Sequence, residues 1–329
     1  MIMCALAWIA FGERSSLSVS EAGGDRKDEA LMKIISASRR TDIPAFYSDW
    51  FMNRILSGQV KVMSPFSSHV WTVSLRPQDV LALAFWTKNA SPLLPRLGEL
   101  KDRGYSMFFL YTVNNYPVEW EPQTPDVRHT VKTLEMISSI FDNRVIRWRY
   151  DPVVITGDFD TKWNLKNFEG LCSLMKHFSG ECIFSFCDYY RKTLKKMRSR
   201  KIDFHEPSRD QAFNMALEMA DIGLKHGITL AACAHDHLIQ SPIIKANCID
   251  RNFVGALLNS NSSLEALNRL KRGRSRSECG CLESIDIGAY NTCYHDCVYC
   301  YATVWPRTER DIFTEAVSAL ECMDPRFNA

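Results

Sequence analysis

Apolar runs of strand length alternate with amphipathic helical segments along most of the chain. Short continuous apolar runs are typical of buried strands, and apolar residues recurring every three or four positions are typical of helices. The pattern predicts strands over 33–38, 70–75, 81–87, 106–113, 144–150, 182–187, 228–233 and 284–290, and helices over 45–56, 93–103, 126–141, 161–178 and 210–226. Such alternation indicates β/α units built on a parallel sheet.

Polar residues collect where each predicted strand ends. In β/α barrels the carboxyl ends of the strands build the active site, so these residues are the first candidates for function. The length of 329 residues fits one barrel-sized domain. We therefore expect an α/β fold with a partial TIM-like (β/α) barrel over residues 32–329.

Composition narrows the class of protein. The chain is 46% apolar and 24% charged with a formal net charge of +2, which is ordinary for a globular protein and makes no general case for nucleic acid. Twelve cysteines are too few for a secreted disulfide scaffold, and their clustering indicates metal ligation in a reducing, cytoplasmic compartment. The apolar run at 2–11 is too short to span a bilayer and no membrane association is expected; we interpret residues 1–31 as an extension preceding a natural start at Met32.

Three cysteines, Cys293, Cys297 and Cys300, form a C-x3-C-x2-C loop directly after the last predicted strand. The segment 284–302 reads as strand, loop and the start of a helix. Three thiolates this close together suit a [4Fe–4S] cluster and leave one iron open to a small molecule. A structural zinc site is the alternative, but it requires four ligands, usually in paired C-x2-C knuckles, and the loop has one such pair.

Four further cysteines form a second candidate metal region over 233–281: Cys233, Cys248, Cys279 and Cys281. Four thiolates can hold an auxiliary iron–sulfur cluster or a zinc ion. The alternative is that Cys233 and Cys248 are simply buried, as free cysteines often are.

Charged and amide side chains at the strand ends are candidates for cofactor binding. Lys88 could hold a cofactor carboxylate or a substrate anion, or be a solvated surface lysine. Arg149 and Asp151 could line the site or form a structural ion pair, and Glu121 could instead favour a helix N-terminus. The full set is Arg39, Arg40, Asp42, Lys88, Asn89, Asn114, Glu121, Arg149, Asp151 and Tyr299.

Cys187 and Tyr189 follow the strand at 182–187, where a thiol or a phenol could donate a hydrogen atom to a substrate radical. The alternative for Cys187 is a place in the core. His295 and Asp296 are expected to be hydrogen-bonding residues of the loop. Two basic runs, 191–201 and 269–276, could bind phosphates, or be a solvated helix face and a flexible lead into the cysteine segment.

The cysteine loop, with Tyr299 directly before its last cysteine, resembles the signature of radical S-adenosylmethionine (SAM) enzymes. The resemblance implies that SAM chelates the open iron and is cleaved reductively to a 5′-deoxyadenosyl radical, which abstracts a hydrogen atom from the substrate. It also implies a reducing partner such as flavodoxin or ferredoxin. The candidate cofactor-binding residues would then contact SAM.

The segments at 41–44, 87–89, 121–125 and 290–302 resemble motifs of the spore photoproduct lyase family, with Asn89 in place of the usual serine. In that family the cysteine loop comes first, whereas here it comes last. This order predicts a circular permutation in which the final strand docks beside the first, as nearby chain ends permit.

The chain from Ile34 to Ala302 also resembles the domain of unknown function 1848 family, through its S-R-R-T-D-I-P start and its D-I-G-x-Y-N-T-C-x-H-x-C-x-Y-C-Y-A end. These resemblances predict a radical SAM enzyme with an unknown substrate, with nucleic-acid repair or modification as one class. An iron–sulfur electron-transfer or sensor protein and a zinc-stabilised nucleic-acid-binding module are the alternatives.

Overall fold

A computed structural model of the chain describes residues 32–273, 277–303 and 320–327. Its centre is an eight-stranded sheet in which all neighbouring strands are parallel. Along the sheet the strands are β10 (Ile285–Asp286), β1 (Lys33–Ala37), β4 (Val80–Thr87), β5 (Met107–Thr112), β6 (Ile146–Val153), β7 (Glu181–Phe186), β8 (Thr229–Ala232) and β9 (Ile244–Lys245). The predicted α/β fold with a parallel sheet is confirmed.

Helices lie on most of the connections between parallel strands, as is usual for such crossovers, whereas β8 and β9 are joined through a 3₁₀ turn at Asp236–Leu238. The helices are α1 (Ile43–Phe46), α2 (Ser48–Ser57), α3 (Leu94–Asp102), α4 (Val127–Phe141), α5 (Thr161–Met175), α6 (Arg191–Ser199), α7 (Arg209–Lys225), α8 (Arg251–Gly255) and α9 (Asn261–Arg269). Asp126, Asp160 and Ser208 begin α4, α5 and α7 by accepting a hydrogen bond from a backbone N–H of the first turn.

The core lies around β4 and β5, in which every residue is buried. Strands of a parallel sheet that is covered on both faces read as continuous apolar runs, as these two do. The ring of Phe85 on β4 packs edge-to-face with Phe51 on α2, at 5.5 Å between centroids, and stacks on Phe109 of β5 at 5.3 Å. Burying one such ring stabilises the fold by about 1.5–3 kcal/mol.

Two features of the large sheet differ from the prediction. The segment 70–75 forms β3 (Val70–Ser74), which pairs with β2 (Gln59–Met63) in a separate antiparallel hairpin and is half exposed. Its place in the large sheet is taken by β9, which is too short to produce a periodic pattern. The helix expected over 45–56 begins earlier, at Ile43, and is interrupted at Tyr47.

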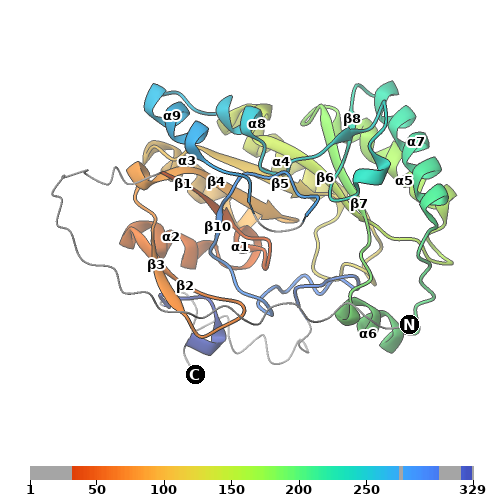
Figure 1. Cartoon of the computed structure of the whole chain (residues 1–329), viewed down its shortest axis with the longest axis horizontal. Helices are drawn as coiled ribbons and strands as arrows, with labels where there is room; N and C mark the ends of the chain where they lie inside the picture. The colour runs from red at the N-terminus through yellow and green to blue at the C-terminus, as the bar shows by residue number, and fades with distance from the viewer. Residues whose placement is uncertain (1–31, 274–276, 304–319, 328–329) are drawn as a thin grey trace, which may run out of the picture. The chain divides into compact units, whose positions relative to one another are not determined.

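The prediction that the last strand docks beside the first is confirmed. Ile285 and Asp286 of β10 pair in parallel with Ile35 and Ser36 of β1 (Figure 1). Gly288 permits the approach, because a Cβ at this position would lie 2.2 Å from Ser38 Oγ. The strand expected over 284–290 is paired over these two residues of β10 only.

Within the described residues, no helix combines the length and apolar character needed to cross a membrane. The extension predicted over 1–31 and the helix expected after the cysteine loop lie outside the described residues.

Candidate functional site: the cysteine loop at the carboxyl edge of the sheet

The cysteine loop, residues 293–300, follows β10 at the carboxyl edge of the sheet. Burial, together with the charge of Cys300, raises the pKa of Cys293 to about 12 and that of Cys297 well above its usual range. Cys297 is buried, and Cys293 and Cys300 are partly buried. Among the described residues no three metal-binding side chains already surround one point, but three cysteines within eight residues are the donor set that an iron–sulfur cluster takes.

Asp42 holds the cysteine loop against the ends of β1 and β4. Its carboxylate accepts hydrogen bonds from His295 Nε2 at 2.7 Å, Thr87 Oγ1 at 2.8 Å and Lys88 N at 2.7 Å. It also accepts from Ala45 N at 3.0 Å, which begins α1. Because both oxygens already have donors, Asp42 positions the loop. His295 is a hydrogen-bonding residue of the loop, as predicted.

A buried polar network surrounds Tyr299, the aromatic residue before the last cysteine. Glu121 accepts from Lys88 Nζ at 2.9 Å, from Asn114 Nδ2 at 3.1 Å and from the Tyr299 hydroxyl, while Asn114 Nδ2 also lies 3.0 Å from that hydroxyl. The Lys88 and Glu121 side chains are only 12% and 3% exposed. Burial opposes both charges, but the pair raises the pKa of Lys88 and lowers that of Glu121. The network brings three strand-end candidates together around the loop.

Asp286 is a second carboxylate that positions the loop, and the sequence analysis did not select it. It accepts from Arg39 N at 2.8 Å, from Gly288 N at 3.1 Å and from the hydroxyls of Ser36 and Ser38. These contacts fix β10 to the turn after β1. A single acidic residue inside the apolar run Ile285–Ile287 was the signal that could have identified it.

Arg39 and Arg149 lie against the Trp86 ring at 4.7 and 5.0 Å from its centroid. Arg149 also forms an ion pair with Asp151, which was one of the two alternatives predicted for these residues. Among the described residues, Trp86 Nε1 and Arg149 Nε are buried without a hydrogen-bond partner. They are two of seven such side-chain atoms in the described part of the chain, and because a buried donor left unsatisfied costs about 1–3 kcal/mol, an acceptor atom beside them would be stabilised.

The remaining candidates have more local roles. Arg40 lies 5.4 Å from the centre of the Tyr290 ring, and the side-chain Oδ1 of Asn89 accepts from Ser91 N at 3.1 Å. Cys187 is buried in the same small apolar cluster as Cys297, and burial raises its pKa to about 12. The Tyr189 hydroxyl donates to a backbone carbonyl at 3.0 Å.

The basic helix α6 contacts the cysteine loop. Lys196 Nζ donates to Asp296 Oδ1 at 2.9 Å and to the Cys297 carbonyl oxygen at 2.7 Å. Arg200 binds the other oxygen of Asp296 at 3.1 Å. Asp296 is thus a hydrogen-bonding residue, as predicted, and α6 is a structural support of the loop. Of the second basic run, 274–276 lie outside the described residues.

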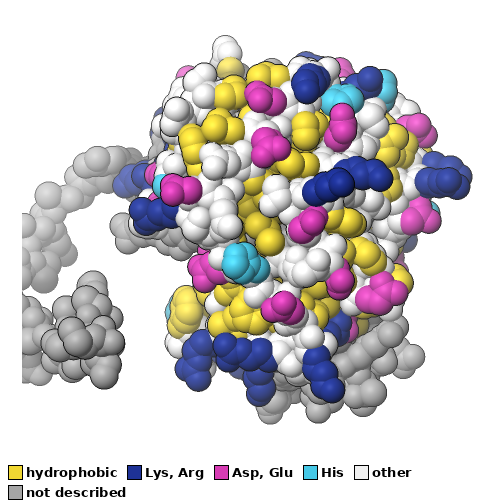
Figure 2. Space-filling model, turned by 90° about the vertical axis from the view of Figure 1, so that its right-hand side faces the viewer, with side chains coloured by type: hydrophobic (Ala, Val, Ile, Leu, Met, Phe, Trp, Pro, Cys, Tyr) yellow, Lys and Arg dark blue, Asp and Glu magenta, His cyan; other side chains and the backbone are white. Residues whose placement is uncertain are grey.

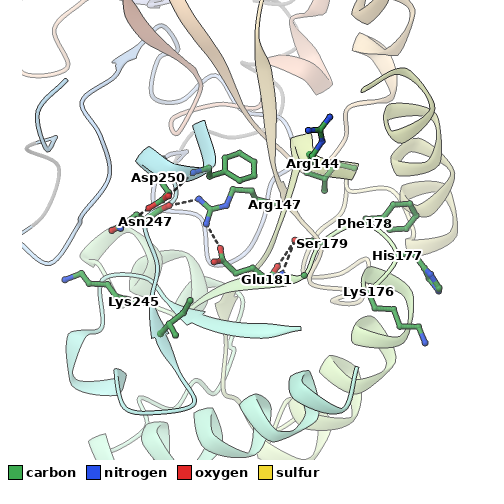
Figure 3. A pocket seen from close by; sticks show the side chains of 14 residues that line it. Arg144, Arg147, Lys176, His177, Phe178, Ser179, Glu181, Lys245, Asn247 and Asp250 are labelled. Atoms are coloured by element: carbon green, nitrogen blue, oxygen red, sulfur yellow. Dashed lines mark hydrogen bonds and ion pairs between the residues drawn. The ribbon is translucent and has the colours of Figure 1, made fainter. Parts of the chain in front are cut away.

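A cavity of about 580 Å³ lies away from the cysteine loop, at the amino ends of β6 and β7. Figure 3 shows Arg147 in its wall, hydrogen-bonded to Glu181 and to the backbone of Asn247. Its lining includes four Lys or Arg side chains, Arg144, Arg147, Lys176 and Lys245, and two acidic ones, Glu181 and Asp250. The cavity shares no residue with the network around Tyr299, so we do not assign it to the same site.

Fold and site define an α/β protein with a parallel sheet that carries a three-cysteine loop at its carboxyl edge. Residues 34–302 match a family described as "Domain of unknown function (DUF1848)", and the chain belongs to this family. Neither the curated proteins nor the solved structures contain a match.

Proposed function

We propose that this protein is a radical SAM enzyme whose cluster is bound by Cys293, Cys297 and Cys300. The observation that carries the proposal is the placement of the loop. The C-x3-C-x2-C segment lies at the carboxyl edge of a parallel sheet, where the ends of β1, β4 and β5 contribute Asp42, Lys88 and Asn114 to its support. That edge is where β/α folds place their active sites.

The chain's own residues then have distinct roles. A [4Fe–4S] cluster on the three cysteines would supply the electron that cleaves SAM. Asp42 and Asp286 hold the loop in place through backbone and side-chain donors. The buried Lys88–Glu121 pair fixes Tyr299 beside the cysteines and excludes water from that side. Trp86 Nε1 and Arg149 Nε are donors for acceptor groups of SAM or of the substrate.

The sheet order supports a permuted partial barrel as the architecture behind this site. The cysteine-loop strand is last in the chain but first in the sheet, beside β1 (Figure 1). A radical SAM unit that begins with its cysteine-loop strand would have this spatial order after permutation. The described strands run from β10 to β9 as an open series, as a partial barrel requires.

The test is anaerobic reconstitution of the full chain with iron and sulfide, followed by dithionite and SAM. We expect 5′-deoxyadenosine, detected by chromatography, from the wild type and from the control Cys172→Ala, a buried cysteine on α5. Cys297→Ala should form none. A wild-type protein that carries the cluster but neither binds nor cleaves SAM would be an electron-transfer or sensor protein, and the proposal would be wrong.

One observation favours a polyanionic substrate such as a nucleic acid. Lys and Arg side chains gather along the lower part of the face in Figure 2, on the side where Figure 1 places α6. Arg191, Lys192 and Lys195 of α6 are exposed, and Lys196 of the same helix contacts the cysteine loop. A phosphate backbone bound to this helix would lie beside the candidate active site.

Affinity for single-stranded and double-stranded DNA and RNA, measured over a salt series, tests this substrate class. Replacing Arg191, Lys192 and Lys195 together by alanine should weaken binding and flatten its salt dependence. A matched control replaces the exposed Lys162 and Lys166 of α5. Equal binding by both variants would direct the substrate search to small metabolites or peptides.

A further inference from the structure

Four cysteines from separate segments converge at the ends of β8 and β9. Cys233 follows β8, Cys248 follows β9, and Cys279 and Cys281 belong to the segment before β10. The sulfurs of Cys233 and Cys248 are 3.7 Å apart. The side chain of Cys281 interacts with those of both Cys248 and Cys279, so the four cysteines form one connected group.

We propose that Cys233, Cys248, Cys279 and Cys281 bind one Zn²⁺ ion as a four-thiolate site, separate from the cysteine loop. The distance of 3.7 Å between the Cys233 and Cys248 sulfurs carries the assignment. Zinc–sulfur bonds of about 2.3 Å at a tetrahedral angle place two ligand sulfurs about 3.8 Å apart. Ligands of a four-iron cluster bind four different irons and are spread more widely, so contact between sulfurs favours a single ion.

The local backbone brings these segments together. Arg272 and Leu282 pair in an antiparallel bridge, and Arg272 Nε donates to the Cys279 carbonyl oxygen at 2.6 Å. Gly280 separates the two cysteines, and a Cβ there would lie 2.0 Å from Asn247 Oδ1. Glycine therefore lets the Cys279–Cys281 segment approach the residue that precedes Cys248.

Arg147 holds the segment that carries Cys248 in position. The Arg147 guanidinium donates to the carbonyl oxygens of Asn247 at 2.6 Å and Cys248 at 2.8 Å, and it pairs with Glu181 (Figure 3). The Arg147 side chain is only 7% exposed. A buried arginine that binds two consecutive carbonyls fixes the position of the ligand between β9 and α8, as a metal site requires.

Donors to the ligand segments lie close to the sulfurs. Arg147 donates to the Cys248 carbonyl oxygen at 2.8 Å, and Cys281 Sγ accepts a hydrogen bond from Ile249 N at 3.5 Å. Metal ligation requires deprotonated cysteine, and a nearby positive charge and an N–H donor suit that form.

In the part of the chain that the structure describes, no three metal-binding side chains already surround a single point as ligands of one ion. Within the described residues the sulfurs of Cys233 and Cys248 are in contact, and Cys281 interacts with Cys248 and Cys279 from the other side of the group. We expect zinc to draw the four sulfurs together by rotation of the cysteine side chains. Metal binding would thereby tie the end of β8 to the segment that leads into β10.

The test is the zinc and iron content of the purified full chain, measured by mass spectrometry. We expect one zinc per chain in the wild type, in Cys297→Ala and in Cys182→Ser, and none in Cys248→Ser. Cys182 is the matched control because it is as deeply buried as Cys248. If Cys297→Ala keeps its zinc but no longer cleaves SAM, the zinc site is separate from the cysteine loop. The two proposals can therefore fail independently.

Cobalt substitution gives a readout that does not depend on activity. Co²⁺ added to the zinc-free protein should give the intense visible bands of tetrahedral thiolate ligation, and Zn²⁺ should bleach them. Cys279→Ser, at a half-exposed position, repeats the test if Cys248→Ser does not fold. Three results would overturn the proposal. Cys279→Ser could lose iron and sulfide in place of zinc, the wild type could contain a Cys233–Cys248 disulfide without metal, or the wild type could contain no metal at all.

Discussion

The two cysteine groups of this protein are assembled in different ways. The cysteine loop takes its three thiols from eight consecutive residues, and carboxylates on other segments hold it in position. The four-cysteine cluster, made of Cys233, Cys248, Cys279 and Cys281, takes its thiols from separate segments that the fold brings together. A local motif indicates its chemistry before the fold is known, whereas a dispersed set becomes a site only through the fold.

Removing the metal from the four-cysteine cluster should lower the stability of the protein more than any substitution considered below. If zinc is a thousandfold above its dissociation constant, its removal costs about 4 kcal/mol of unfolding free energy and lowers the midpoint of thermal unfolding by about 6 °C. Calorimetry with and without a strong chelator measures this. Cys248→Ser should melt at the same temperature with or without chelator, and an unchanged wild-type midpoint would contradict a structural zinc.

Breaking the buried pair beneath the cysteine loop should have the next largest effect. Lys88→Met leaves Glu121 buried without its cation, which we expect to cost about 3 kcal/mol. The loss is at the low end for such pairs because Asn114 and Tyr299 still donate to Glu121. Denaturant unfolding measures it, and the zinc content should stay unchanged.

Combining Lys88→Met with Glu121→Gln gives the control for this prediction. The double variant removes both charges, so it should recover part of the loss, with a coupling of about 2 kcal/mol. If the double variant is less stable by the full sum of the two single losses, the two charges are not coupled, and the network does not support the loop as described.

Two glycines provide a closer comparison of the two regions. A Cβ at Gly288 would meet Ser38 Cβ at 2.5 Å, whereas a Cβ at Gly280 meets the end of the Asn247 side chain, which can rotate away. We therefore expect Gly288→Ala to cost about 2–3 kcal/mol and Gly280→Ala about 1 kcal/mol.

Gly288→Ala should reduce SAM cleavage and Gly280→Ala should weaken zinc binding, each without the other effect. Gly170→Ala, in an open position on α5, is the control and should be neutral or stabilising. Equal losses of unfolding free energy in Gly280→Ala and Gly288→Ala would show that Ser38 moves out of the way as easily as the Asn247 side chain does.

The sequence predicted the parts of the fold that rest on long periodic segments. It identified seven of the eight sheet strands, the docking of the last strand and the cysteine loop, because each has a local pattern. It did not reveal β9, which has only two residues. It also did not show that β3 belongs to a separate hairpin with β2, because the half-buried pattern of β3 resembles that of a strand in the large sheet. The Lys88–Glu121 pair and the contact between the Cys233 and Cys248 sulfurs depend on tertiary packing, which the periodicity of one segment does not contain.

The smallest expected effect concerns the support that α6 gives to the cysteine loop. Arg200 binds Asp296 at 3.1 Å, but its side chain is 34% exposed, and Lys196 holds the same carboxylate at 2.9 Å from a more buried position. Arg200→Ala should therefore cost about 0.5 kcal/mol, since partly exposed ion pairs contribute little, and the loss should shrink as salt is added. Lys196→Ala should cost more and should also lower SAM cleavage, because Lys196 contacts the Cys297 carbonyl oxygen as well. Equal, salt-independent losses from the two variants would mean that Asp296 is held by packing, and that α6 supports the loop through its apolar face.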